Sequence, residues 1–306
     1  MQTVTLNAFG KINLTLDVTG RREDGYHLVR MVMQSVSLYD TLTFSLRGDG
    51  QNTLVLSAES TAEGAQALPV DGSNLILRAI RMMQERFHIT YGIDAVLTKR
   101  IPMAAGLAGG SADAAAAFYA MNELFHLNLT TQDLQQIAVK LGADIPFCLA
   151  GGTRLAEGVG EVLSEIPPMP DCHILIGKPP VDVSTKAVYT ALDERAGTAY
   201  AGIIHPNVDG QIAALKREDI GGVSRAMGNV LETVTVMTTP AIGRIRDLMR
   251  TEGATGAMMT GSGPTVFGLF TEEVKARRAY DALLMSGLCA DVAMATPVRN
   301  GLAIVT

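Results

Sequence analysis

Tryptophan is absent from this 306-residue chain, and aromatic residues make up only 5% of it. Proteins that bind single-stranded nucleic acid stack bases on aromatic side chains, so few residues are available for such a surface. The chain also has no excess of positive charge, because its formal net charge is −6. General nucleic-acid binding needs a basic surface, and the composition argues against it. The composition is still compatible with binding of a phosphorylated small ligand, since a few backbone N–H groups and one or two lysines can hold such a ligand locally.

Cysteines are few, and long apolar runs are missing. Cys148, Cys172 and Cys289 lie far apart and form no C-x-x-C pair, which argues against a zinc site and a disulfide framework. The chain does not open with a basic segment followed by an apolar one, as a secretory signal would. No apolar run reaches the roughly 18 residues that span a bilayer. We therefore expect a cytoplasmic protein without a membrane segment.

Hydrophobic residues make up 47% of the chain, so it can bury a large core. Alternation of apolar and polar residues predicts strands in the first part of the chain, at residues 3–6, 12–18, 32–38, 41–44 and 93–97. A polar, glycine-containing loop is expected at residues 19–27. Helical spacing of apolar residues, with capping residues before it, predicts helices at residues 74–87, 111–124 and 131–141.

A proline-rich stretch near the middle of the chain predicts a domain boundary. Pro167, Pro168 and Pro170 interrupt regular structure there. Beyond them we expect further strands and helices, the strands at residues 173–176, 257–259 and 266–269 and the helices at 184–192, 224–235, 240–252 and 274–286. The sequence therefore predicts two domains, residues 1–165 and 166–306.

The strongest chemical signal is a glycine-rich segment between a predicted strand and an alanine-rich helix. Gly106, Gly109 and Gly110 lack a Cβ atom and let the backbone approach a ligand closely. The helix that follows directs its unpaired N–H groups and the positive end of its dipole back into this segment. Ser111 can cap that helix, and Asp113 in the first turn suits the dipole. The segment predicts an anion site that fits a polyphosphate.

A tight strand-to-helix turn, with small residues for close packing, explains the glycines alone equally well. The segment is not a P-loop, because no Lys-Ser or Lys-Thr pair follows the glycines. It also lacks the G-x-G-x-x-G pattern of dinucleotide-binding folds. The residues of this segment thus leave a phosphate site and a packing turn both open.

Three motifs, in order along the chain, resemble those of the GHMP kinases, a family that includes galactokinase and homoserine and mevalonate kinases. They are residues 8–14 (AFGKINL), the glycine-rich segment at 102–115 and residues 259–267 (MTGSGPTVF). The resemblance implies an α+β fold of two domains, the first like domain 2 of ribosomal protein S5 and the second a ferredoxin-like sandwich. The active site would lie in the cleft between them. It also implies transfer of the γ-phosphoryl group of ATP to an alcohol, with Mg²⁺.

The resemblance assigns ATP to the N-terminal domain. The expected ATP-binding residues are Pro102, Met103, Ala104, Ala105, Gly106, Leu107, Ala108, Gly109, Gly110, Ser111 and Ala112, with Asn74, Leu75 and Lys99 around the adenosine. Ser111 is also the expected weak metal ligand, through Mg-ATP. Ala108 and Ala112 stand where Gly and Ser are frequent in the family, and both substitutions leave the backbone cradle feasible.

Lys11 and Asp144 are the expected catalytic pair. From the residues alone, a lysine near a strand start is usually solvated, and Asp144 before Ile145-Pro146 is a helix N-cap. With the resemblance, Asp144 is the general base or the group that orients the acceptor hydroxyl. Lys11 would lie near it, keep it ionised and offset charge on the transferring phosphoryl group.

The stretch Asp24-Gly25-Tyr26-His27 resembles one branch of the family, whose acceptor is methylerythritol linked to cytidine diphosphate, an intermediate of non-mevalonate isoprenoid biosynthesis. Tyr26 and His27 would recognise the cytosine, and Tyr189 would stack on its opposite face. The other expected substrate-binding residues are Asn13, Gly261, Ser262 and Gly263. From the residues alone, an exposed Tyr-His pair can be incidental, and residues 261–263 can form a tight hairpin turn.

Two other functions stay open at this point. Another GHMP kinase, for homoserine or mevalonate, is disfavoured because neither substrate contains a pyrimidine for the loop at residues 24–27. A catalytically inactive member that acts as a binding module is disfavoured because Lys11, Asp144 and the three glycines are all present. We expect a small-molecule substrate and no nucleic-acid or membrane partner, with the chain a monomer or homodimer.

Overall fold

The computed structural model describes residues 2–196, 200 and 202–305, and two β-sheets organise these residues. The larger sheet is built on a long antiparallel pair, β1 (Thr3–Arg21) and β2 (His27–Arg47). Its other strands are β4 (Gly92–Thr98), β3 (Thr53–Leu56), β5 (Thr153–Glu157), β6 (Val162–Glu165), β8 (Gly228–Asn229) and β12 (Leu302–Ile304). The smaller, antiparallel sheet has the order β11 (Asp291–Ala295), β7 (His173–Lys178), β10 (Val266–Phe270) and β9 (Gly256–Met259).

The first two strands are longer than the alternation of residues predicts. β1 is one continuous strand where two were expected, at residues 3–6 and 12–18. β2 likewise replaces the two strands expected at residues 32–38 and 41–44. Register shifts between β1 and β2 absorb the irregular positions without ending the ladder. The central part of β1 is buried on both faces, so its pattern lacks the clean alternation of a half-buried strand.

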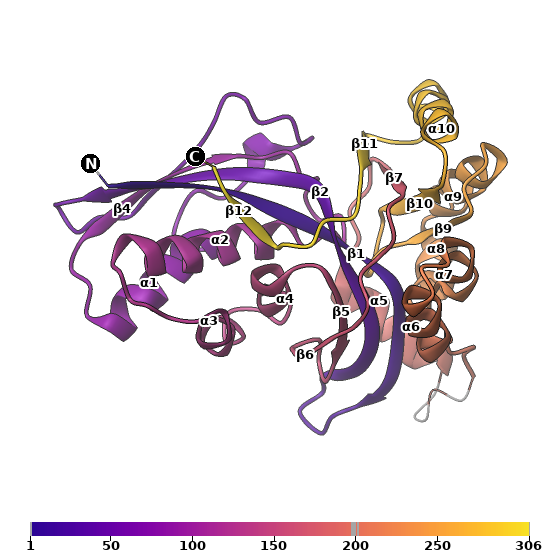
Figure 1. Cartoon of the computed structure of the whole chain (residues 1–306), viewed down its shortest axis with the longest axis horizontal. Coiled ribbons are helices and arrows are strands. Elements are labelled where there is room, and N and C mark those ends of the chain that lie inside the picture. The colour runs from indigo at the N-terminus through magenta and orange to yellow at the C-terminus, as the bar shows by residue number, and fades with distance from the viewer. Residues whose placement is uncertain (1, 197–199, 201, 306) are drawn as a thin grey trace.

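Four helices pack beside the larger sheet (Figure 1): α1 (Leu75–Phe87), α2 (Gly109–Leu124), α3 (Thr131–Ala138) and α4 (Ile145–Ala150). α1 is amphipathic, and Ile76, Ile80 and Met83 at helical spacing are all buried. α2 is buried on nearly all sides, since its alanines allow close contact with α1 and β1. These packed helices hold the glycine-rich segment before α2 in place.

The second half of the chain adds α5 (Thr185–Ala196), α6 (Val208–Lys216), α7 (Ile220–Ala226), α8 (Glu232–Thr238), α9 (Ala241–Thr251) and α10 (Glu273–Ser286). Of these, α9 and α10 pack on the smaller sheet, on the right in Figure 1. The helix predicted at residues 224–235 is wrong. It is divided between α7 and α8 by β8, which pairs in parallel with β1. The side chain of Asn229 donates to the carbonyl oxygens of Met259 (2.9 Å) and Gly261 (2.8 Å), and these tertiary bonds interrupt the helix.

The α+β class is confirmed, since helices and two sheets occur together in the described residues. The predicted boundary at residues 165 and 166 falls between β6 and β7. Two later strands return to the larger sheet, because β8 and β12 both pair with β1. The boundary therefore stays a prediction. In the part of the chain that the structure describes, no helix is long and apolar enough to cross a membrane.

Candidate active site

A cavity of about 890 Å³ lies between the two halves of the chain. Its walls come from β1, β2, the glycine-rich segment, α5 and the turn after β9. Most of the expected site residues line it: Lys11, Asn13, Tyr26, His27, Leu75, Lys99, Pro102, Met103, Ala104, Ala105, Gly106, Ala108, Gly109, Gly110, Ser111, Asp144, Tyr189, Gly261 and Ser262. Residues from three separate motifs thus face one space.

The glycine-rich segment forms one end of the cavity. Gly106 has a positive φ of 72°, and a Cβ atom there would lie 2.5 Å from the carbonyl oxygen of Thr260. Only glycine therefore lets the segment pack against the turn after β9. The backbone N–H of Lys11 donates to the carbonyl oxygen of Leu107 (3.0 Å), which ties the segment to β1. The first turn of α2, with its unpaired N–H groups, opens onto the cavity.

The start of α2 differs from the sequence prediction by two residues. The helix begins at Gly109, and its N-cap is Ala108 in a left-handed conformation (φ 56°), without a side-chain cap. Ser111 is thus inside the first turn, where its hydroxyl borders the cavity, and it does not cap the helix. Asp113 lies one turn deeper and is buried, so it does not interact with the dipole at the first turn.

Lys11 and Asn13 lie on β1 in the middle of the cavity. Lys11 is only 4% exposed, and its ammonium group donates to the side-chain oxygen of Asn13 (2.8 Å). The backbone N–H of Asn13 donates to the hydroxyl of Thr260 (3.0 Å), which fixes this part of β1 against the turn after β9. The structure therefore holds a positive charge and an amide side by side, facing the cavity.

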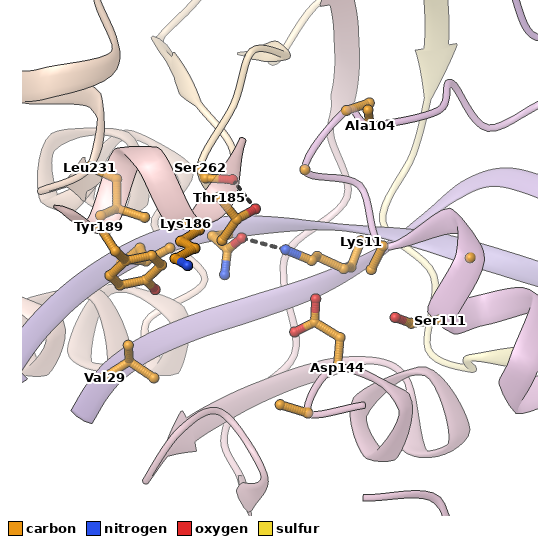
Figure 2. Close-up of a pocket in the computed structure, with 18 of the residues that line it drawn as sticks. Lys11, Val29, Ala104, Ser111, Asp144, Thr185, Lys186, Tyr189, Leu231 and Ser262 are labelled. Atoms are coloured by element: carbon orange, nitrogen blue, oxygen red, sulfur yellow. Dashed lines mark hydrogen bonds between the residues drawn. The ribbon is translucent and has the colours of Figure 1, made fainter. Parts of the chain in front are cut away.

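Asp144 lies across the cavity from Lys11. It occupies the N-cap position of α4, as the sequence predicts, with Pro146 in the first turn. Its carboxylate does not cap the helix, however, and points toward Lys11 (Figure 2). No direct ion pair joins these two side chains in the described structure. A carboxylate and an ammonium group thus face the same space, which leaves room for an acceptor oxygen.

Aromatic side chains form the end of the cavity opposite the glycine-rich segment. The rings of His27 and Tyr189 lie 4.5 Å apart, centroid to centroid, at an angle of 34°. Tyr26 borders the same region and is 64% exposed. Burial raises the pKa of Tyr189, and the negative charge of Asp144 raises it further. These residues provide flat surfaces suited to a planar base.

Asp193, on α5, organises this aromatic end. One carboxylate oxygen accepts from the Tyr200 hydroxyl (2.6 Å) and is 2.8 Å from Nε2 of His27, while Arg21 donates to the other oxygen (3.2 Å). Burial would raise the pKa of Asp193, but the hydrogen bonds from Tyr200 and His27 outweigh it and lower the pKa. Asp193 therefore stays ionised and orients the imidazole ring.

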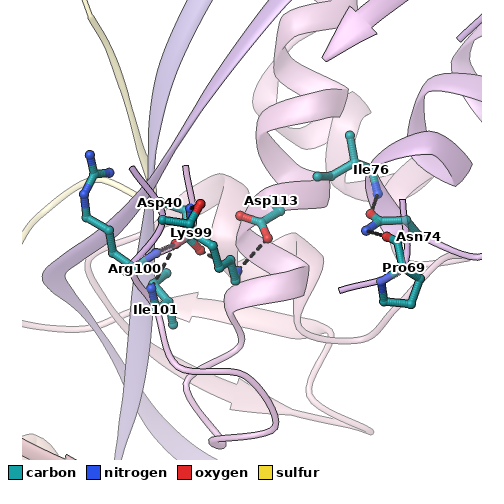
Figure 3. Close-up of polar contacts among 9 residues, drawn as sticks. Asp40, Pro69, Asn74, Ile76, Lys99, Arg100, Ile101 and Asp113 are labelled. Atoms are coloured by element: carbon teal, nitrogen blue, oxygen red, sulfur yellow. Dashed lines mark hydrogen bonds and ion pairs between the residues drawn. The ribbon is translucent and has the colours of Figure 1, made fainter. Parts of the chain in front are cut away.

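Lys99 borders the cavity, but its charge is directed into the protein (Figure 3). Its ammonium group is paired with Asp40 (2.5 Å) and Asp113 (2.6 Å), and the side chain is only 2% exposed. Burial would lower the pKa of Lys99, but the two carboxylates raise it. Burial also raises the pKa of Asp113 to about 8, against the opposing charge of Lys99. Asp40 further accepts from the N–H groups of Arg100 and Ile101, where the glycine-rich segment starts.

Four expected site residues do not line the cavity, namely Asn74, Leu107, Ala112 and Gly263. Asn74 caps α1, accepting from the N–H of Ile76 (2.9 Å) and donating to the carbonyl oxygen of Pro69 (2.7 Å). Leu107 and Ala112 are buried in the core. Local structure thus accounts for these side chains, and Leu75 beside Asn74 reaches the cavity instead.

Several cavity residues were not predicted, and they include Leu16, Arg21, Val29, Met31, Leu68, Thr185, Lys186, Thr190, Asp193 and Leu231. The helical repeat could have identified three of them. On α5, Thr185 lies four residues before Tyr189, Lys186 lies three residues before it, and Asp193 lies four residues after it. The three side chains therefore share a helix face with Tyr189. The apolar residues give no such signal, because their spacing is the same as that of core residues.

Sequence comparison identifies the class of protein that has this fold and site. The model of the GHMP kinases N terminal domain matches residues 74–152, and that of the GHMP kinases C terminal domain matches residues 211–285. The chain belongs to the GHMP kinase family. The first match contains the glycine-rich segment and Asp144, and the second contains the turn after β9.

Within this family the chain is similar to the 4-diphosphocytidyl-2-C-methyl-D-erythritol kinases. It is 49% identical to the one from Lachnospira eligens, over 89% of this chain and 91% of that protein. A crystal structure of 4-(cytidine 5'-diphospho)-2C-methyl-D-erythritol kinase has a TM-score of 0.77 at 31% identity, covering 96% of this chain and 98% of that one. A homoserine kinase from Cytophaga hutchinsonii has the same TM-score at 23% identity, covering 100% and 98%, so it shares the fold alone.

Proposed function

We propose that the chain transfers the γ-phosphoryl group of ATP to the 2-hydroxyl of 4-diphosphocytidyl-2-C-methyl-D-erythritol, giving the 2-phosphate and ADP. This reaction belongs to the non-mevalonate route to isoprenoid precursors. One observation carries the proposal: the glycine-rich segment, the pair Lys11 and Asp144, and the aromatic residues His27 and Tyr189 line one cavity. The names of the similar kinases support the same acceptor.

The triphosphate of ATP would lie at the glycine-rich segment. The N–H groups at the start of α2 and the helix dipole favour a polyanion there, beside Gly109, Gly110 and Ser111. Leu68 and Leu75 would border the adenosine, with the ammonium group of Lys99 directed away from it. This placement aims the γ-phosphorus at the middle of the cavity, where Lys11 and Asp144 lie.

Asp144 would accept the proton of the acceptor hydroxyl. The acceptor oxygen forms a bond to the γ-phosphorus, the bond from that phosphorus to the β,γ-bridging oxygen breaks, and ADP leaves. A carboxylate cannot fully deprotonate a tertiary alcohol beforehand, so proton transfer accompanies or follows phosphoryl transfer. Lys11 offsets negative charge on the transferring group, and the rigid placement of both reactants supplies much of the rate.

Mg²⁺ would enter as a complex with ATP and neutralise charge on its phosphates. The residues fit this form of the metal, because Mg²⁺ bound to nucleotide phosphates needs few protein ligands. The Ser111 hydroxyl borders the phosphate region, and Asp144 is the nearby carboxylate of the cavity wall. Among residues 2–196, 200 and 202–305, no cluster of three acidic, histidine or cysteine side chains forms a separate metal site.

An acceptor assay tests the proposed function. Purified protein with Mg-ATP is offered the cytidyl-linked methylerythritol, homoserine or mevalonate, and release of ADP is measured. We expect ADP release with the first acceptor alone. Activity only with homoserine or mevalonate would overturn the assignment, and no activity with any acceptor would favour an inactive binding module. A cytoplasmic location and a monomeric or homodimeric state stay predictions.

A further inference from the structure

Among the residues that the structure describes, four lysine or arginine side chains border the cavity, and they differ in how their charge is compensated. Lys99 is paired with two buried carboxylates, and Arg21 is paired with Asp193. Lys11 donates to the neutral side chain of Asn13. Lys186 has its carbonyl oxygen hydrogen-bonded to Thr190, but its ammonium group has no acidic partner among the described residues.

The position of Lys186 adds to this difference. It lies in the first turn of α5, where the helix dipole disfavours a cation, so helix stability does not explain its charge. It lies three residues before Tyr189 on the same helix and thus on the same face. Figure 2 shows its ammonium group between the Tyr189 ring and the end of Lys11. Lys186 therefore lies between the aromatic end and the catalytic pair.

We infer that Lys186 binds the diphosphate group of the acceptor and so selects an alcohol that carries one. The inference rests on the proposed function and deepens it. In the acceptor, the diphosphate joins the cytidine to the methylerythritol, so it lies between the base and the reacting hydroxyl. This order matches the order of Tyr189, Lys186 and Asp144 along the cavity.

Neighbouring hydroxyls suit the same ligand. The hydroxyls of Thr185 and Ser262 are 2.8 Å apart beside Lys186, and both line the cavity. One of them donates to the other, which leaves one hydroxyl hydrogen for a phosphate oxygen. The ammonium group is a flexible point charge that can follow a phosphate during binding. A hydrogen bond to a charged partner is strong enough that its loss weakens binding roughly ten- to a hundredfold.

Binding of cytidine and of cytidine diphosphate, measured by calorimetry with ADP present to fill the donor site, tests the inference. The variants are Lys186→Met, which removes the charge at similar length, and Lys186→Arg, which keeps it. Lys216→Met, an exposed lysine on α6 outside the cavity, is the control. We expect Lys186→Met to weaken cytidine diphosphate roughly ten- to a hundredfold and leave cytidine unchanged. Lys186→Arg should restore most of the affinity.

Steady-state kinetics provide a second measurement. Lys186→Met should raise KM for the cytidyl-linked acceptor and leave KM for ATP near the wild-type value. Equal loss of cytidine and cytidine diphosphate affinity, or no loss of either, would overturn the inference while wild-type turnover still supports the proposed function. Wild-type protein that binds cytidine diphosphate through Lys186 but fails to phosphorylate the acceptor would overturn the proposed function alone.

Discussion

Asp144 lies at the start of α4 and also borders the cavity. As an N-cap residue it can make a hydrogen bond to its helix, yet its carboxylate faces the cavity. Asp144→Asn keeps the size of the side chain and removes its ability to accept a proton. We expect kcat to fall roughly 10²- to 10⁴-fold, with the affinity for ADP unchanged.

Asp281→Asn, which changes an exposed acid on α10 outside the cavity, is the control for this variant. Turnover by Asp144→Asn at the wild-type rate would remove Asp144 from the chemistry. A parallel loss of ADP affinity would show that Asp144 acts on the nucleotide site and not on the acceptor.

Lys99 is a residue whose main effect should be on stability. Lys99→Met removes the cation from the buried cluster of Asp40 and Asp113, and removing one partner of a buried ion pair typically costs about 3–5 kcal/mol. We expect urea unfolding to show a loss of this size. Lys140→Met, at an exposed lysine outside the cavity, should leave the unfolding free energy nearly unchanged. An equally small effect of Lys99→Met would show that the cluster does not depend on the lysine charge for its stability.

The same cluster predicts a dependence of stability on pH. Burial raises the pKa of Asp113 to about 8 from an ordinary value of 3.8, so between these values the folded state holds a proton that the unfolded state has lost. The contribution of Asp113 to the unfolding free energy therefore falls as pH rises from about 4 to 8. Without the cation, the deficit of Lys99→Met should be larger at pH 8 than at pH 5.5. Urea unfolding at both pH values measures this, and equal deficits would contradict it.

At the scale of elements, two glycines of the glycine-rich segment can test how much its contact with the turn after β9 contributes to stability. Gly106 has a positive φ and would place a Cβ atom 2.5 Å from the carbonyl oxygen of Thr260. A Cβ atom at Gly110, inside α2, would have its nearest contact 3.7 Å away, at Leu75. Gly106→Ala should lower the unfolding free energy by at least about 1–2 kcal/mol, and Gly110→Ala should not lower it.

Thermal unfolding of both glycine variants measures the difference. Gly106→Ala should also raise KM for ATP, because the start of α2 shifts with the segment. If both variants unfold at the wild-type temperature, the segment does not depend on its contact with Thr260.

Elements with a clear local pattern of capping and apolar residues were predicted well. The helices α1, α9 and α10 and the strands β7 and β10 occur near the expected residues, because capping residues and apolar spacing act within one element. β8 was not predicted, because a strand of only two residues has no recognisable pattern. Its pairing with β1 divides the helix expected at residues 224–235.

At the scale of the whole molecule, the two halves share their core. One cluster of buried residues joins Ile12, Val36 and Leu107 of the first half to Ile174 and Phe267 of the second. We therefore expect a fragment of residues 1–165 to lack a cooperative unfolding transition, since it loses this core and the pairing of β1 with β12. Circular dichroism during heating measures this. A sharp transition near that of the full chain would show that the predicted first domain folds independently.

The main residues of the proposed site were identifiable from the chain alone, and they line one cavity: the glycine-rich segment, Lys11, Asp144 and the pair Tyr26 and His27. They stand in short motifs, and the geometry of a short motif depends mainly on its own backbone and side chains. The tertiary structure alone decided in which direction the charged side chains point and which further residues line the cavity. The ammonium group of Lys99 turns to Asp40 and Asp113, 59 and 14 residues away along the chain. Lys186 joins the cavity on α5, whose Asp193 contacts Arg21 of β1 and His27 of β2. Such contacts form only when distant segments meet, so no local pattern records them.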